Sequence, residues 1–176
     1  MADAVGVTRE LPPWYIQRAT PQDAKDVRAL RLAMLESDEH SYDVDPLLAH
    51  QLPLEHWALW VSDNRAVFFA TAEGPGDGQR HVGMVAGNID THAAIKTAHV
   101  GALWVVPSHR TSGIARALLD AIHNWASRES VTRCVLSVAE WNTNAIALYE
   151  SLGYALNDES VTTRHGHREL VMVLGL

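Results

Sequence analysis

Apolar residues recur along the chain with two different periods, and these periods divide it into strands and helices. Thr20 and Pro21 form a typical helix start, and the apolar residues that follow at helical spacing predict a helix as far as Ser37. An almost unbroken apolar run at 98–106 predicts a central strand covered on both faces. A second long helix is expected after it, through about Arg128.

The other expected elements are shorter. Further strands are expected at 14–18, 65–72, 81–89 and 134–138, with the last strands at Tyr154 and 169–174, and further helices at 54–61 and 142–152. Six turn residues between the second and third runs predict an antiparallel hairpin. The composition of 38–53 is loop-like, which predicts a loop and a flexible lid. The order of elements predicts an α/β fold, with a twisted mixed sheet and helices on both faces.

Composition limits the organisation and the partners. With 176 residues and 47% apolar content, we expect one domain over 14–176, after a flexible leader at 1–13. The 14 Lys and Arg against 21 Asp and Glu give a net charge of -7, which argues against a nucleic-acid surface. The longest apolar stretch, 100–106, is far shorter than the ~20 residues of a membrane span, and the N-terminus has no signal pattern. We therefore expect a cytoplasmic protein without a membrane partner.

The strongest chemical signal is the turn after the central strand. Residues 108–116 run directly into the long helix, and Ser112, Gly113 and Ala115 are small enough for a ligand to approach the backbone. Unpaired N–H groups and the positive end of the dipole at a helix start attract phosphate. The turn has neither the lysine of a phosphate-binding P-loop nor the three glycines of a dinucleotide fold. The alternative is a plain strand-to-helix turn that needs small residues.

Two segments together resemble the GNAT superfamily of acyl-CoA-dependent N-acyltransferases. The Gln/Arg-x-x-Gly-x-Gly/Ala signature of that family is matched at Arg110, Gly113 and Ala115. Its second signature, Asn-x-x-Ala-x-x-Leu-Tyr-x-x-x-Gly-Phe/Tyr, is matched at Asn142, Ala145, Leu148, Tyr149, Gly153 and Tyr154. The resemblance is tight over 98–154 and implies the GNAT fold. Thr111 departs from the pattern, since the family often has glycine there, and its bulk is expected to weaken cofactor binding modestly.

The resemblance implies an acetyl-CoA site between the strands at 103–106 and 134–138. The residues that it assigns to the site are Leu103, Trp104, Val105, Arg110, Thr111, Ser112, Gly113, Ile114, Ala115 and Asn142. The backbone amides of 110–115 would hold the pyrophosphate, and the backbone of Leu103 and Val105 would hold the pantetheine. Trp104 and Trp141 are cleft candidates, whereas Trp57, Trp60 and Trp125 have core spacing. Asn142 would bond the cofactor arm, and as a good helix N-cap it has a structural alternative.

Two residues are candidates for the chemistry. The resemblance makes Tyr149 the acid that protonates the departing CoA thiolate, and the alternative is an ordinary half-buried tyrosine. Many family members have a Glu at the position of His99. His99 could take a proton from the amine directly or through water, or it could only line the acceptor cleft. Cys134 is expected to be a small buried side chain, not an acyl carrier.

The function implied is an N-acetyltransferase that moves acetyl from acetyl-CoA to a primary amine of a small molecule or peptide, by direct attack in a ternary complex. The alternative is a non-catalytic acyl-CoA-binding or sensing module, since the usual Glu is absent at His99. An acidic run from Glu36 to Asp45 could attract a cationic amine or form a solvated surface. No metal is expected, because His165 and His167 lack a partner set. The resemblance leaves a homodimer open, because exposed strands near the C-terminus commonly support dimers in this family.

Overall fold

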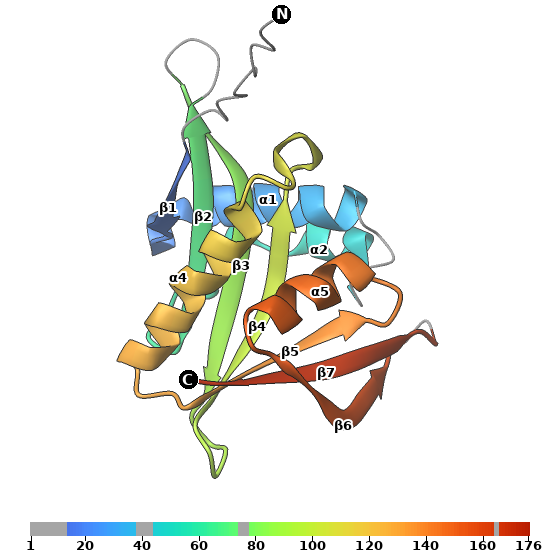
Figure 1. Cartoon of the computed structure of the whole chain (residues 1–176). Coiled ribbons are helices and arrows are strands. Elements are labelled where there is room, and N and C mark those ends of the chain that lie inside the picture. Colours follow the sequence, from blue (N-terminus) through green and yellow to red (C-terminus); the bar gives the residue numbers. More distant parts are fainter. Residues whose placement is uncertain (1–13, 38–43, 74–77, 164–165) are drawn as a thin grey trace, which may run out of the picture.

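Helices enclose a seven-stranded sheet from both sides in the computed structural model, which describes residues 14–37, 44–73, 78–163 and 166–176 (Figure 1). The strands are Trp14–Arg18 (β1), Arg65–Glu73 (β2), Gln79–Asp90 (β3), Thr97–Val105 (β4), Arg133–Ala139 (β5), Ala155–Thr162 (β6) and Arg168–Gly175 (β7). The helices are Ala24–Ser37 (α1), Pro46–Gln51 (α2), Leu54–Ala58 (α3), Ile114–Arg128 (α4) and Thr143–Ser151 (α5), with short 3₁₀ turns at Pro21–Asp23 (η1) and Pro107–His109 (η3). The predicted α/β fold is confirmed.

The strands follow the order β1-β2-β3-β4-β5-β7-β6. Neighbouring strands are antiparallel, as in the predicted β2–β3 hairpin, except that β4 and β5 are parallel. A parallel pair needs a crossover connection, and α4 supplies it here. Only residues 106–113, which include η3, separate the carboxyl end of β4 from the start of α4.

Each face of the sheet has its own apolar core. In Figure 1, α4 and α5 lie over one face, and α1 and α2 lie over the other. Ile114, Leu118 and Ile122 of α4 are buried in the first core, as the helical period predicts. Val27 and Met34 of α1 are buried in the second core. Burying each such side chain contributes about 1.5–3 kcal/mol, so these faces hold the helices on the sheet.

The helix α2 corrects the expectation of a continuous loop before the helix at 54. Asp45 caps it, because its Oδ1 accepts a hydrogen bond of 2.8 Å from the backbone N–H of Leu47. Pro46 occupies the first turn, where its missing N–H costs nothing. The helix is short and only Ala49 is buried, so its apolar period is too weak to detect.

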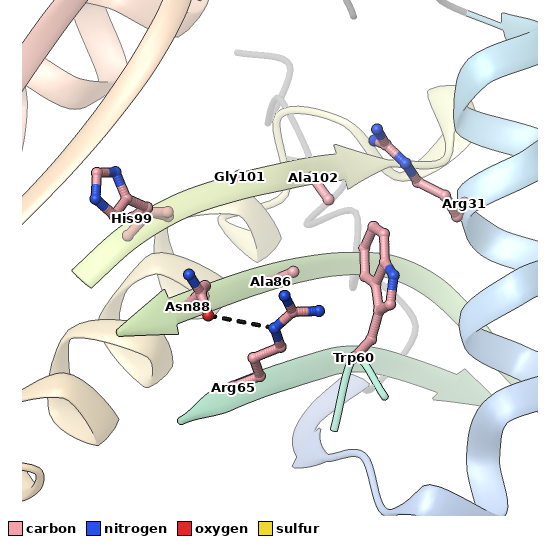
Figure 2. Close-up of a pocket in the computed structure, with 10 residues that line it drawn as sticks. Arg31, Trp60, Arg65, Ala86, Asn88, His99, Gly101 and Ala102 are labelled. Carbon is pink, nitrogen blue, oxygen red and sulfur yellow. Dashed lines mark hydrogen bonds between the residues drawn. The ribbon is translucent and has the colours of Figure 1, made fainter. Parts of the chain in front are cut away.

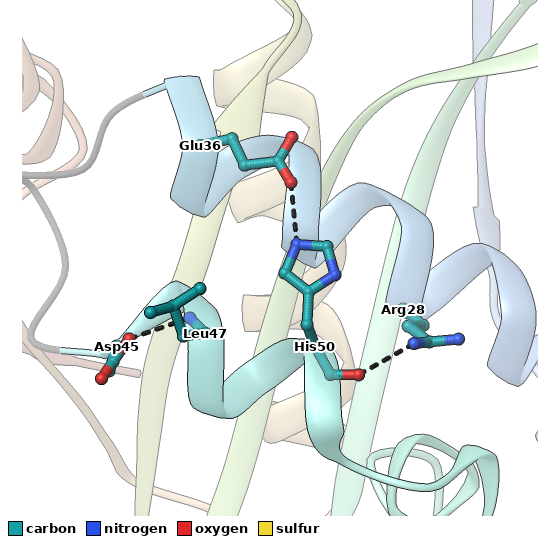
Figure 3. Close-up of polar contacts among 5 residues, drawn as sticks. All are labelled: Arg28, Glu36, Asp45, Leu47 and His50. Carbon is teal, nitrogen blue, oxygen red and sulfur yellow. Dashed lines mark hydrogen bonds and ion pairs between the residues drawn. The ribbon is translucent and has the colours of Figure 1, made fainter.

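Polar contacts tie α2 to α1 (Figure 3). His50 Nε2 and Glu36 Oε1 are 2.9 Å apart, and Arg28 Nη2 donates to the His50 carbonyl oxygen at 3.0 Å. Two members of the acidic run thus have structural contacts, Glu36 in this pair and Asp45 as a cap. The remainder of that run, at 38–43, lies outside the described residues, as does the expected leader at 1–13.

None of the helices in the four described ranges combines the length and the apolar content that a membrane crossing requires.

Candidate active site

The strands β4 and β5 diverge within the sheet, and their divergence opens a cleft, called here the fork cleft. Three registered pairs join the strands, and His99 with Val135 is the pair nearest their carboxyl ends. Just beyond it β4 has a bulge, where its register with β3 shifts and Ala102 has a φ of 51°. The fork cleft, about 400 Å³, is lined by residues 99–103 of β4 and 135–139 of β5. Beyond His99 this stretch of β4 keeps β3 on one side, but no registered pair joins it to β5 on the other.

This opening corrects the prediction that β4 is covered on both faces throughout. Both ends of β4 are buried, but His99 and Gly101 are exposed. A Cβ atom on Gly101 would meet no atom within 4 Å. An apolar run alone cannot distinguish a strand packed under helices from a strand that lines a cleft, because both positions favour apolar residues.

The turn from β4 into α4 forms one side of a second cavity, called here the α4 hollow, of about 560 Å³. Thr111 and Gly113 have φ values of 62° and 86°, in the left-handed region. Gly113 adopts this conformation without steric cost, and a Cβ atom there would meet nothing within 4 Å. Thr111 adopts it at a cost of about 1–2 kcal/mol. The amides of Ile114 and Ala115 open the helix, so no carbonyl within α4 accepts from them.

Nine of the ten predicted cofactor residues line the α4 hollow: Leu103, Trp104, Val105, Arg110, Thr111, Gly113, Ile114, Ala115 and Asn142. The tenth, Ser112, donates its hydroxyl hydrogen to the carbonyl oxygen of His109 at 2.6 Å, which shapes the turn. Arg110 donates Nε–H to the Val105 carbonyl oxygen at 3.0 Å. This bond ties the turn to the end of β4. That these residues bind a cofactor stays a prediction.

Two basic residues of the α4 hollow escaped the sequence analysis. Arg116 lines it from the first turn of α4, and its Nη2 donates to Ser151 Oγ at 2.6 Å, which links α4 to α5. His109 lines it from the preceding turn. In the sequence, nothing distinguishes Arg116 from a solvated helix residue. In the structure, the guanidinium of Arg116 lines the hollow at the start of α4, where the helix dipole already favours anions.

Asn142 stands where the two cavities join, because it lines both the fork cleft and the α4 hollow. Its Oδ1 accepts a hydrogen bond of 3.2 Å from the backbone N–H of Ala145, so the N-cap interpretation is confirmed. This bond uses only the side-chain oxygen. The amide nitrogen still offers donors, so the cap leaves room for a ligand contact.

Tyr149 lines the fork cleft from α5 and is 8% exposed. Burial raises the pKa of its phenol to about 12. Within the described residues no group forms a hydrogen bond with its hydroxyl, and its ring packs against that of Tyr154, with ring centroids 5.7 Å apart. The hydroxyl therefore keeps its proton at neutral pH and can donate it inside the cleft.

A third cavity, called here the arginine hollow, opens on the other face of the sheet and measures about 320 Å³. Figure 2 shows it: Arg65 reaches from β2 across β3 toward Asn88, Trp60 stands beside it, and Arg31 extends from α1. His99, with Gly101 and Ala102, lines both this hollow and the fork cleft. His99 therefore stands where the two cavities meet.

Sequence reasoning missed the walls of the arginine hollow. Trp57 and Trp60 have the same helical spacing, but only Trp57 is core, at 1% exposed. Trp60 lies beyond the end of α3 and packs against the Arg31 guanidinium, 5.6 Å from its ring centroid. Arg65 donates Nε–H to Asn88 Oδ1 at 3.2 Å. These residues are far apart in the chain, so no local motif marks them.

Of the other candidates, Cys134 and Trp141 lie outside the three cavities, whereas Trp104 lines one of them. Cys134 is buried, and burial raises the pKa of its thiol to about 11, which confirms that it is a small buried side chain and not a thiolate. Trp141, predicted for the cleft, instead lies exposed with its ring edge-on to His167, at 4.9 Å between centroids. His165 lies outside the described residues. Trp104 is buried and forms a wall of the α4 hollow.

Comparison with known proteins gives relatives of one kind. The catalytic subunit NAA20 of the N-terminal acetyltransferase B complex from Arabidopsis thaliana is 32% identical over 90 residues, 51% of this chain and 51% of that protein. A thialysine N-epsilon-acetyltransferase from Caenorhabditis elegans is 36% identical over 56 residues, 32% of this chain and 35% of that protein. The chain thus spans about half or less of these relatives.

The fold has close structural counterparts. A crystal structure of a GNAT-family acetyltransferase from Streptococcus pneumoniae superposes with a TM-score of 0.75 at 20% identity, covering 93% of this chain and 100% of the other. The model of the acetyltransferase (GNAT) family matches residues 29–154, which include strands β2 to β5 and helices α4 and α5. The chain belongs to the GNAT acetyltransferase family.

Proposed function

We propose that the chain is an N-acetyltransferase that transfers an acetyl group from acetyl-CoA to a primary amine within a ternary complex. One observation carries this proposal: the three cavities form a continuous series through the sheet. The α4 hollow shares Leu103 and Asn142 with the fork cleft, and the fork cleft shares His99 and Gly101 with the arginine hollow. Two substrates that enter from opposite faces would meet in the fork cleft.

The α4 hollow fits the CoA end of the donor substrate. Its turn combines free helix-start amides with the cation of Arg116, and both attract a pyrophosphate. Gly113 leaves open space in front of the backbone. The pantetheine arm would follow Leu103, Trp104 and Val105 toward the fork cleft, with the Asn142 amide as a donor along the way.

The bulge in β4 gives the fork cleft its chemistry. Backbone groups at 101–103 lack neighbours on β5, and Gly101 has no side chain to cover them. A backbone N–H fixed beside the thioester would stabilise negative charge on its oxygen as the amine nitrogen attacks the carbonyl carbon. As the carbon–nitrogen bond forms, the carbon–sulfur bond breaks and leaves a thiolate.

Tyr149 is proposed as the acid that protonates this thiolate. Its raised pKa, caused by burial, keeps the hydroxyl protonated until the thiolate appears. An ammonium has no lone pair with which to attack, so the amine must first lose a proton. We propose that His99, at the junction of the fork cleft and the arginine hollow, accepts that proton directly or through water.

We further propose one acetyltransferase domain over 14–176 acting in the cytoplasm. The described elements from β1 to β7 all join one sheet, which supports a single domain. The homodimer stays a prediction, with the exposed outer strand β6 as its candidate surface.

The test of the function is release of the CoA thiol from acetyl-CoA across peptides, polyamines, aminoglycosides and amino acids, with a control that lacks an acceptor. Acceptor-dependent release supports the proposal and gives the class of amine. Calorimetry measures acetyl-CoA binding in parallel. Binding without release from any acceptor would favour the acyl-CoA sensor, and absence of both would overturn the proposal.

A further inference from the structure

We infer that the amine acceptor carries a carboxylate, which the arginine hollow recognises. The inference rests on the proposed function and specifies its substrate. Among the described residues that line the hollow, two are arginines, one is histidine and none is a carboxylate. The chain as a whole has a net charge of -7, so a cation-lined cavity of about 320 Å³ is a local exception.

The two arginines are held by different contacts. Arg31 is 8% exposed and packs against the Trp60 ring, which fixes its guanidinium at the wall of the hollow. Arg65 is exposed, and its bond from Nε to Asn88 Oδ1 orients the guanidinium across β3 (Figure 2). That bond uses one N–H of five, so donors remain for an anion. A planar guanidinium offers them in the geometry that a carboxylate accepts.

The charges along the series of cavities also set a direction for the acceptor. Arg31 and His99 line both cavities, but only the fork cleft adds a carboxylate, Glu169, and only the arginine hollow adds a second arginine, Arg65, among the described residues. An acceptor with an amine at one end and a carboxylate at the other would place its amine toward His99 and its carboxylate toward Arg65. The same chemistry occurs in a free amino acid and in a peptide with an acidic side chain near its amino terminus.

Matched acceptor pairs test this inference. One arm compares glycine, β-alanine and γ-aminobutyrate with their carboxamides, and the other compares the amidated peptides Ala-Glu-Ala-Ala and Ala-Gln-Ala-Ala. We expect kcat/KM to be at least about tenfold higher for the acid than for its amide counterpart in one arm or both. A preference in the first arm indicates a free amino acid as the acceptor, and a preference in the second arm indicates a peptide with an acidic side chain. A carboxamide lowers the pKa of the neighbouring amine and so frees its lone pair, which makes this preference opposite to intrinsic reactivity.

Variants assign the preference to the hollow. Arg65→Gln should reduce the acid-to-amide ratio to within about threefold of unity, chiefly through KM, because the contact is made before the chemical step. Arg65→Lys should keep part of the preference. Arg80→Gln is the matched control, since Arg80 is exposed on β3 outside the three cavities and its loss changes the net charge equally. Unchanged acetyl-CoA affinity in calorimetry shows that each variant is folded.

Two results of the acid–amide comparisons would overturn the inference. One is equal or faster acetylation of the amides by the wild-type protein, and the other is an acid preference that Arg65→Gln leaves intact. The diamine putrescine, which has no carboxylate, distinguishes a wrong acceptor class from a wrong proposed function. Turnover of putrescine without turnover of any acid would overturn only the acceptor class, whereas no turnover of any amine would overturn the proposed function as well.

Discussion

His99 on β4 pairs with Val135 on β5, and this pair is the point from which the two strands diverge. One side of the divergence leads to the turn before α4 and the other leads to Arg31 and Arg65. A single branching point in the sheet thus connects a site suited to an anionic donor with a site suited to an acceptor. The following predictions test the residues along this route.

Gly113→Asp should weaken acetyl-CoA binding at least about tenfold relative to Gly113→Asn. Asn and Asp have nearly the same shape and tolerate the left-handed backbone, so the pair isolates the added charge at the start of α4. Calorimetry measures the affinities, and thermal midpoints check that both variants fold alike. Equal affinities would place the pyrophosphate away from this turn.

Tyr149→Phe should lower kcat about 100-fold or more while acetyl-CoA affinity changes less than about twofold, because the phenol acts on the leaving thiolate. The rate of CoA release at saturating substrates is the measurement. Tyr15→Phe, at an exposed position of the edge strand β1, is the control for loss of a phenol elsewhere. An unchanged kcat would remove Tyr149 from the chemistry.

His99→Gln should lower kcat at least about tenfold at saturating acceptor, whereas His99→Glu should retain more activity. Glu and Gln have the same size, but only Glu can accept a proton, and many family members have Glu at this position. The comparison of the two variants therefore tests proton transfer apart from cavity shape. Full activity of His99→Gln would show that His99 only lines the junction.

The free energy of unfolding should fall as the pH falls below about 6.5, in part because of His123. Its Nε2 lies 2.8 Å from the Tyr154 hydroxyl, and burial lowers its pKa, although Asp120 acts in the opposite direction. The unfolded chain takes up the proton near pH 6.5 and the folded chain resists it, so protonation favours unfolding between that pH and the lower folded pKa.

Urea denaturation at pH 7.5 and 5.5 measures this dependence. His123→Gln should lose less stability between the two pH values than the wild-type protein does. His92→Gln is the control, since His92 is exposed and its hydrogen bond to Asp90 Oδ1 comes from the backbone N–H, which glutamine keeps. Equal losses in wild type and His123→Gln would exclude His123 as a source of the pH dependence.

Most residues of the α4 hollow could be predicted to lie together because one continuous segment carries them. The strand, the turn and the start of α4 follow each other from Leu103 to Ala115, so local sequence sets their geometry. The walls of the arginine hollow were not predictable in the same way. Arg31, Trp60 and Arg65 come from separate elements, and only packing of α1 and α3 on the sheet brings them together.

The fold shows a similar division. Long elements with a strong apolar period, such as α1 and α4, were predicted closely because their buried faces fix the period. The helix α2 was missed because it buries one residue, although Asp45 and Pro46 form a helix start. The open middle of β4 depends on the bulge at Ala102, which has no apolar signature.

The most direct test of the account is a two-substrate rate matrix, with acetyl-CoA and an active amine varied together. Direct attack in a ternary complex predicts double-reciprocal plots whose lines intersect. The buried thiol of Cys134 agrees with this expectation, since burial raises its pKa to about 11 and a protonated thiol is a poor nucleophile. Parallel lines, with an acetylated protein in its intact mass before any amine is added, would contradict the account.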